Sequence, residues 1–189
     1  MEQENYPKAL CLFGPALVMH RKKAGMSQSR LSIAAAINAT QLRTIEKGGS
    51  QPGVEVAVRL VATLGYSVGK FFQQLAEQGG LPVLPDTPGC KGMVEAENDY
   101  IQELHLPLEK SESKARSTFG LMFKEVRLHY GITQKIVAEK ARYNLRNLLN
   151  VESGSQEPGI MTALAMVCAT GADVEVFFEK LCQLLYDKR

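Results

Sequence analysis

The sequence predicts an all-α protein built from two tandem copies of a small five-helix domain. Two observations support this fold class. Apolar residues recur at helical spacing, and a long stretch of the chain repeats, so that Phe13 aligns with Phe119 and Leu75 with Leu181. The repeat holds between these limits without a gap. A match of this length without insertions indicates two copies of one domain.

The repeat also defines the expected domain boundaries. We expect an N-terminal domain over residues 1–78, a linker over 79–117 and a C-terminal domain over 118–189. The linker is acidic and contains the Gly/Pro-rich run GGLPVLPDTPGCKG, which disfavours helices. A short helix over 94–104 is expected within it.

The first copy centres on residues 27–48, SQSRLSIAAAINATQLRTIEKG, which predict two short helices joined by a tight turn. Ser27 and Asn38 are suitable N-cap residues, because their side chains can accept backbone N–H groups of the first turn. Apolar side chains at helical spacing supply one buried face for each helix. The second copy repeats this pattern over residues 133–154, TQKIVAEKARYNLRNLLNVESG.

One helix is expected before this pair and two helices after it. The first covers about residues 12–24, and the basic residues near its C-terminal end suit the helix dipole. A fourth helix with a valine-rich stripe ends at Gly65, and Ser67 caps a fifth. Phe71 and Phe72 on the fifth helix are expected to contact the core or a dimer partner.

An ordered motif occurs in both copies: Arg-x-x-x-Gly-x-Ser/Thr-Gln, then a buried aliphatic residue, Glu-x-Gly and Pro-Gly. This set resembles the helix-turn-helix domain of phage repressors and XRE-type bacterial regulators. The resemblance implies two tandem helix-turn-helix domains and a sequence-specific regulator of transcription, usually a repressor, that binds double-stranded DNA. It also implies structural ion pairs between Arg21 and Glu46 and between Arg127 and Glu152.

The second helix of each pair would then be the recognition helix that enters the major groove. Gln and Asn can pair with adenine, Arg with guanine, and the Thr methyl can contact the thymine methyl. In the first copy the predicted DNA-contacting residues are Gln28, Asn38, Thr40, Gln41, Arg43, Thr44 and Lys47. In the second copy they are Gln134, Lys135, Asn144, Arg146, Asn147 and Asn150. Because the two sets differ, the two half-sites should differ.

Charge is unevenly distributed along the chain. The first copy holds eight Lys/Arg against two Asp/Glu, whereas the second copy holds seven of each. The first copy is therefore the better phosphate-binding body. The second copy leaves two hypotheses open. It reads DNA, or it binds a protein through the apolar Leu145 and Leu149, as in an antitoxin or a subunit of a nucleoprotein complex.

The linker length allows two ways of bringing recognition helices together. The copies can form a pseudo-dimer within one chain, or two chains can form a homodimer. An intramolecular pair would favour an asymmetric operator, because the halves are unequal. No third domain is large enough to be a conventional small-molecule sensor.

The sequence does not indicate an enzyme or a metal-binding protein. No nucleophile–base set, Gly-rich phosphate loop or pair of carboxylates indicates an enzyme, and no Cys/His group predicts a metal or another cofactor. His20 and His129 are expected at the surface or near phosphates, and the four cysteines as reduced thiols. Without a signal peptide or a membrane-spanning run, the expected location is a bacterial cytoplasm, or the host cytoplasm for a phage protein.

Overall fold

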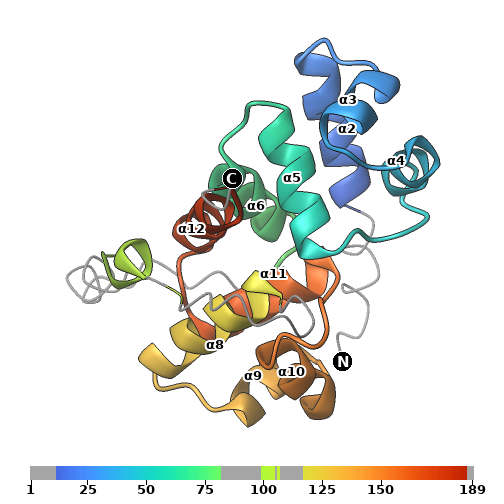
Figure 1. Ribbon diagram of the computed structural model, residues 1–189. Helices are drawn as coiled ribbons and strands as arrows, with labels where there is room; N and C mark the ends of the chain where they lie inside the picture. The colour runs from blue at the N-terminus through green and yellow to red at the C-terminus, as the bar shows by residue number, and fades with distance from the viewer. Residues whose placement is uncertain (1–11, 82–98, 105, 107–116, 187–189) are drawn as a thin grey trace.

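The computed structural model describes residues 12–81, 99–104, 106 and 117–186, and every regular element within these ranges is a helix. This confirms the all-α fold class. The first half contains α2 (Phe13–Lys23), α3 (Gln28–Ala34), α4 (Ala39–Glu46), α5 (Val54–Thr63) and α6 (Val68–Gln78). The second half contains α8 (Thr118–His129), α9 (Gln134–Lys140), α10 (Leu145–Glu152), α11 (Ile160–Thr170) and α12 (Val174–Tyr186) (Figure 1).

The local structure of the second half repeats that of the first half at the spacing of the sequence repeat. The turns that follow α3 and α9 place Ala36 and Arg142, which align with one another, at φ 50° and 49°. A positive φ is uncommon for residues other than glycine. Its recurrence at equivalent positions shows that the same turn joins the paired helices in each half. That the halves are two copies of one domain remains a prediction.

Side chains cap the N-termini of the paired helices in both halves. The Ser27 hydroxyl accepts a backbone N–H of α3 at 3.2 Å, and the Asn38 side chain accepts one of α4 at 2.7 Å. Thr133 and Asn144 do the same for α9 and α10. Each of these N–H groups would otherwise lack an intrahelical partner. The caps therefore fix where the short helices begin.

Glycine allows the first helix of each half to pack closely against the third, α2 against α4 and α8 against α10. A Cβ added to Gly14 of α2 would overlap the carbonyl oxygen of Ile45 in α4. The same relation joins Gly120 of α8 to Val151 of α10. Any larger residue at these positions would push the recognition helix away from its support.

The two halves pack against each other through equivalent residues. Phe72 of α6 and Phe178 of α12 place their ring centroids 4.5 Å apart, and both side chains are fully buried. Gly53 and Gly159, just before α5 and α11, form an antiparallel backbone bridge. Each pair joins positions that align in the repeat. The halves are therefore related by an approximate two-fold axis that passes through these contacts, and α6 and α12 lie side by side at the centre (Figure 1).

The contact between α6 and α12 is not symmetric in its chemistry. A Cβ on Gly69 would overlap the backbone oxygen of Glu175, the residue that aligns with it. The Glu179 carboxylate accepts the Gly69 backbone N–H at 2.9 Å and the Ser67 hydroxyl at 3.1 Å. An acidic side chain from the second half thus caps the N-terminus of α6, where negative charge is stabilising.

A second carboxylate crosses between the halves in the same direction. Glu157, which precedes α11, accepts the backbone N–H of Glu55 in the first turn of α5 at 2.6 Å. The residue that aligns with Glu157 is the uncharged Gln51. Both of these caps run from the second half to the first, and the aligned residues Gln51 and Gln73 carry no charge, so the two sides of the interface are not interchangeable. In the other direction, the Glu55 carboxylate accepts the Thr118 backbone N–H at 3.4 Å.

A short helix at 99–103 lies between the halves in the sequence. Ile101 and Leu104 are buried in the common core, and the Tyr100 ring stacks on His129 of α8 at a centroid distance of 3.7 Å. Residues 94–98 of the expected helix lie outside the described residues. This part of the linker is thereby attached to the second half.

Gly69→Val is expected to separate α6 from α12, because the added side chain meets backbone rather than a flexible side chain. Overpacking of this kind costs about 1–3 kcal/mol of unfolding free energy. Urea unfolding measures this loss of unfolding free energy. Lys70→Ala, at the exposed neighbouring position, is the control and should leave stability near that of the wild type. Equal midpoints for all three proteins would contradict the close contact.

The interface also predicts a pH dependence. Desolvation raises the pKa of Glu157, an effect that the hydrogen bond from Glu55 opposes in part. A raised pKa means that the folded state binds the proton more tightly than the unfolded chain, whose value is near 4.5. The stabilisation that protonation gives is present below that value and is lost as pH rises through the raised pKa.

Glu157→Gln keeps an oxygen acceptor but removes the ionisation. The melting temperature of this variant, relative to that of the wild type, is expected to increase as pH rises from about 4 to about 7. Thermal unfolding measures this difference. Glu139→Gln changes the charge equally at an exposed position of α9 and serves as the control. A pH-independent difference between Glu157→Gln and the wild type would contradict this account.

Candidate nucleic-acid interface

The helix α4 presents a polar surface because its apolar residues anchor it to the core. Leu42 and Ile45 are buried, and the other face of the helix is exposed. That exposed face carries Thr40, Gln41, Arg43 and Thr44. One face of a two-turn helix is therefore free to hydrogen-bond with an external partner.

A buried ion pair fixes α4 against α2. The Arg21 guanidinium donates from Nε to Glu46 Oε1 at 2.6 Å and from a terminal nitrogen to Oε2 at 2.9 Å. A further N–H of the same guanidinium donates to the backbone oxygen of Met26 at 2.8 Å. The hydrogen bond with Glu46 raises the pKa of Arg21, so the guanidinium stays charged. The ion pair that the family resemblance implied is confirmed.

Gln28 joins this ion pair from α3. Its side-chain amide donates to Glu46 Oε2 at 2.7 Å, and the residue is half-buried. The carboxylate of Glu46 thus accepts N–H groups from both other helices, and it sets the angle between α3 and α4. The amide of Gln28 thus reaches α4. Its contact with DNA remains a prediction.

The second half repeats this arrangement. Arg127 donates to both oxygens of Glu152, at 2.5 and 2.8 Å, and also to the backbone oxygen of Ile132. The Gln134 amide donates to Glu152 Oε2 at 2.7 Å. The support of α10 is therefore the same as that of α4, although the outer faces of the two helices differ.

The remaining predicted contact residues are all exposed. Asn38 and Asn144 already act as caps through their side-chain oxygens, and the Thr44 hydroxyl donates to the backbone oxygen of Thr40 at 3.0 Å. The exposed set comprises Asn38, Thr40, Gln41, Arg43, Thr44 and Lys47 in the first half, and Lys135, Asn144, Arg146, Asn147 and Asn150 in the second. Their accessibility is consistent with a DNA surface, and their contacts remain predictions.

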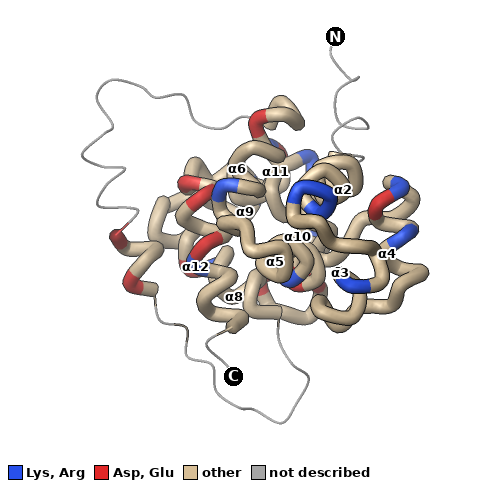
Figure 2. The backbone as a smooth tube through the Cα atoms, turned by 90° about the horizontal axis from the view of Figure 1, so that it is seen from above, with Lys and Arg blue, Asp and Glu red and all other residues tan. Residues whose placement is uncertain are grey.

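Basic residues that the predicted set omits extend this surface. Lys22 and Lys23 at the end of α2 and Arg30 on α3 are exposed. Figure 2 shows Lys and Arg gathered over α2, α3 and α4. The signal in the sequence was the net positive charge of the first copy, which did not by itself say which cations share a face.

His20, which was expected at the surface or near phosphates, is covered on one side by aromatic side chains. It is half-buried, and its ring packs edge-on against Tyr66 and Phe71 with centroids 4.6 and 5.0 Å away. Its Nδ1 lies 2.9 Å from the backbone oxygen of Ala16. The aromatic side chains of α6 and the preceding loop cover this part of α2, which the sequence pattern of α2 alone did not reveal.

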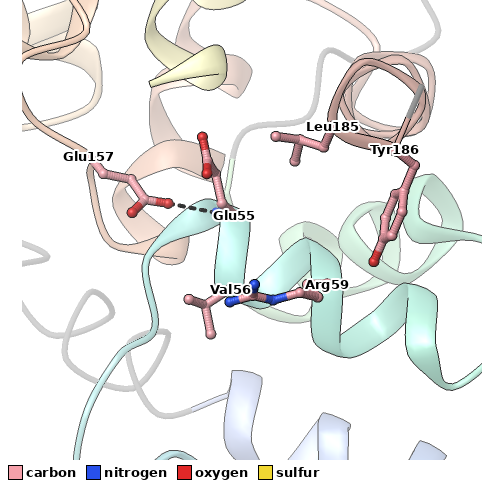
Figure 3. Close-up of a pocket in the computed structure, with 6 residues that line it drawn as sticks. All are labelled: Glu55, Val56, Arg59, Glu157, Leu185 and Tyr186. Atoms are coloured by element: carbon pink, nitrogen blue, oxygen red, sulfur yellow. Dashed lines mark hydrogen bonds between the residues drawn. The ribbon is translucent and has the colours of Figure 1, made fainter. Parts of the chain in front are cut away.

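A small pocket lies away from the recognition helices, at the interface of the halves. It has a volume of about 210 Å³, and its lining includes Glu55 and Arg59 of α5, Glu157 from the loop before α11, and Leu185 and Tyr186 of α12 (Figure 3). Ligand sites for drug-sized molecules usually exceed about 300 Å³. In Figure 3 the Glu157 carboxylate points to the Glu55 backbone N–H, so the pocket is part of the contact between the halves.

The described residues contain no arrangement of side chains that indicates metal-binding or thiol chemistry. No group of three His, Cys, Asp or Glu side chains there could hold a metal ion. Cys168 and Cys182 are free thiols, and burial raises their pKa to about 12 and about 11, so both are protonated. Cys11 and Cys90 lie outside the described residues. None of the described helices is long and apolar enough to cross a membrane.

Comparison with known proteins supports the assignment of the first half. A family model for helix-turn-helix proteins matches residues 19–71, from within α2 to within α6. This match supports a DNA-binding regulator of the helix-turn-helix class. No curated protein and no solved structure matches the chain. The assignment of the second half rests on the internal repeat and is a proposal.

Removal of one partner of the buried ion pair should be costly, because the other charge is left uncompensated. Arg21→Met is expected to lower the unfolding free energy by about 3–5 kcal/mol. The double variant Arg21→Met/Glu46→Leu should recover much of this loss, since neither charge then remains. Urea unfolding measures both, with the exposed Arg43→Ala as control. A loss below about 1 kcal/mol for Arg21→Met would contradict the supporting role of the pair.

Proposed function

We propose that the protein is a sequence-specific regulator of transcription, acting as a repressor, that binds double-stranded DNA through α4 and α10. The observation that carries this proposal is the exposed polar face of α4, held in a fixed orientation by Arg21, Glu46 and Gln28. This face lies within the segment that matches the helix-turn-helix family. A rigidly supported helix with short polar side chains fits the major groove and its hydrogen-bonding edges.

Affinity for the backbone of DNA would come from the surrounding cations. Lys22, Lys23, Arg30 and Lys47 are exposed beside the paired helices of the first half. Phosphate contacts of this type supply affinity that falls steeply with salt, whereas Arg43 and Gln41 on α4 would supply base preference. The two kinds of contact can therefore be separated by experiment.

The packing of the halves supports a single chain that binds DNA with two helices, α4 and α10. The approximate two-fold axis through Phe72 and Phe178 relates α4 to α10, and the two helices lie on either side of the meeting point of residues 51–53 and 157–159 (Figure 1). Two-fold helix-turn-helix dimers bind half-sites one helical turn apart. On this proposal residues 1–78 and 118–189 are two such domains, residues 79–117 join them, and one chain covers one operator without a homodimer.

Repression would need only occupation of a site that overlaps a promoter. The chain would act where bacterial DNA is, in the cytoplasm. No enzymatic step is required for this role. An alternative, a protein-binding module in place of the second reader, is favoured only by the apolar residues on α10 and is an outcome of the experiments below.

Selection from a random pool of duplexes, with the full chain, tests the proposal. We expect one discrete site that spans two successive major grooves and loses affinity steeply as salt increases. Recovery of weak, sequence-independent binding alone would overturn it.

Arg43→Ala then tests the role of α4. This variant is expected to weaken binding of the selected site by roughly 5- to 150-fold and to relax preference at one base position. Fluorescence anisotropy at fixed salt measures the affinity. Lys70→Ala removes an exposed cation from α6, far from α4 in the fold, and is the matched control. If Arg43→Ala kept the affinity and the base preference of the wild type, Arg43 on α4 would not contact the DNA bases.

A further inference from the structure

The helix α10 exposes two leucines where α4 exposes none. The side chains of Leu145 and Leu149 are on the surface, with 43% and 46% of their areas accessible. They are four residues apart, so they lie one turn apart on the same face of the helix. Exposed leucines usually occur singly, and a pair on one helix face indicates a surface that meets an apolar partner.

At the positions of these leucines, the two halves carry different kinds of side chain. Leu145 aligns with Ala39, and Leu149 aligns with the exposed Arg43 of α4. The difference extends to the preceding helix, where the exposed Ile136 of α9 aligns with Arg30 of α3. The outer surface of the second helix pair is therefore apolar at positions where that of the first is small or basic.

The charge around the leucines limits what can cover them. Lys135 and Arg146 are exposed beside them on α9 and α10, and Asn147 and Asn150 add polar groups. A second copy of the same surface would bring like charges together, which is unfavourable. A polyanion that offers apolar groups among hydrogen-bonding groups fits this surface. The major groove of thymine-containing DNA has this composition, because each thymine presents a methyl group.

We propose that Leu145 and Leu149 read thymine methyl groups, so that α10 recognises a thymine-rich half-site unlike the one that α4 recognises. This inference rests on the proposed function, since it requires the α4 unit to bring the chain onto DNA. On the proposed in-chain pairing of the halves, α10 would meet the neighbouring groove. The operator is then asymmetric: hydrogen bonds from Arg43 and Gln41 specify one half, and methyl contacts specify the other.

Replacement of thymine by deoxyuridine tests the inference, because it removes the methyl group and leaves the hydrogen-bonding edge unchanged. The probe is the duplex recovered by selection with the full chain, with each thymine replaced in turn. We expect a loss of about three- to fivefold in affinity for each contacted thymine, and only in the half-site at α10. Chemical protection of the bound duplex assigns the half-sites.

Variants connect the loss to the two leucines. In Leu145→Ala/Leu149→Ala, the uridine and thymine duplexes should bind equally well. Leu128→Ala, which removes an exposed leucine from α8, is the control and should keep the wild-type preference for thymine. Both leucines are exposed, so their loss should leave the melting temperature near that of the wild type.

The outcomes separate this inference from the proposed function. Equal affinity of the wild type for thymine and uridine duplexes overturns it, and so does a thymine preference that persists in the double leucine variant. Protection of only the α4 half-site also overturns it and assigns the leucines to a protein partner. In each of these cases the α4 unit still binds a discrete site. Failure to recover any discrete site would instead overturn the proposed function itself.

Discussion

A single buried carboxylate holds each recognition helix in place. Glu46 accepts two N–H groups from the Arg21 guanidinium and one from the Gln28 amide, so one side chain of α4 contacts both α2 and α3. A buried ion pair contributes little net stability, because desolvation of both charges offsets their attraction. Its fixed bidentate geometry instead sets the direction of the helix. Together with the burial of Leu42 and Ile45, this contact keeps the polar face of α4 directed outward.

The second constraint is the close contact between the halves. Phe72 and Phe178 join the two cores, and the absence of a side chain at Gly69 lets α6 approach the backbone of α12. Each domain alone is small and buries limited apolar area. The shared core therefore supports both recognition helices. The carboxylates of Glu157 and Glu179 cap helices of the first half, while the residues that align with them are uncharged, which distinguishes pairing between the halves from pairing between two like halves.

The outer surfaces of the two halves differ although their supports are alike. The ion pair, the Gln contact and the caps recur in both halves, while Arg43 on α4 aligns with Leu149 on α10. The supporting residues face the interior, where any change in size or charge is costly. The exposed positions carry no such restriction. A partner whose two halves differ would require two unlike surfaces on a common support.

The sequence by itself determined the local structure. Helical spacing, the caps Ser27 and Asn38 and the internal repeat predicted the all-α fold and the starts of α3 and α4, since these depend on neighbours in the chain. The pairing of Arg21 with Glu46 followed from the family resemblance. Exposure of the predicted contact residues also followed, because helical period separates apolar from polar faces.

Only the tertiary structure decided how the halves meet. The contacts of Phe72 with Phe178 and of Glu55 with Glu157 join segments about one hundred residues apart, and no local pattern encodes the relative position of such segments. The same limit explains His20, whose cover comes from Tyr66 and Phe71 on a distant helix and loop. The linker allowed either a homodimer or an intramolecular pair, and the contact of α6 with α12 within one chain supports the proposal of an intramolecular pair.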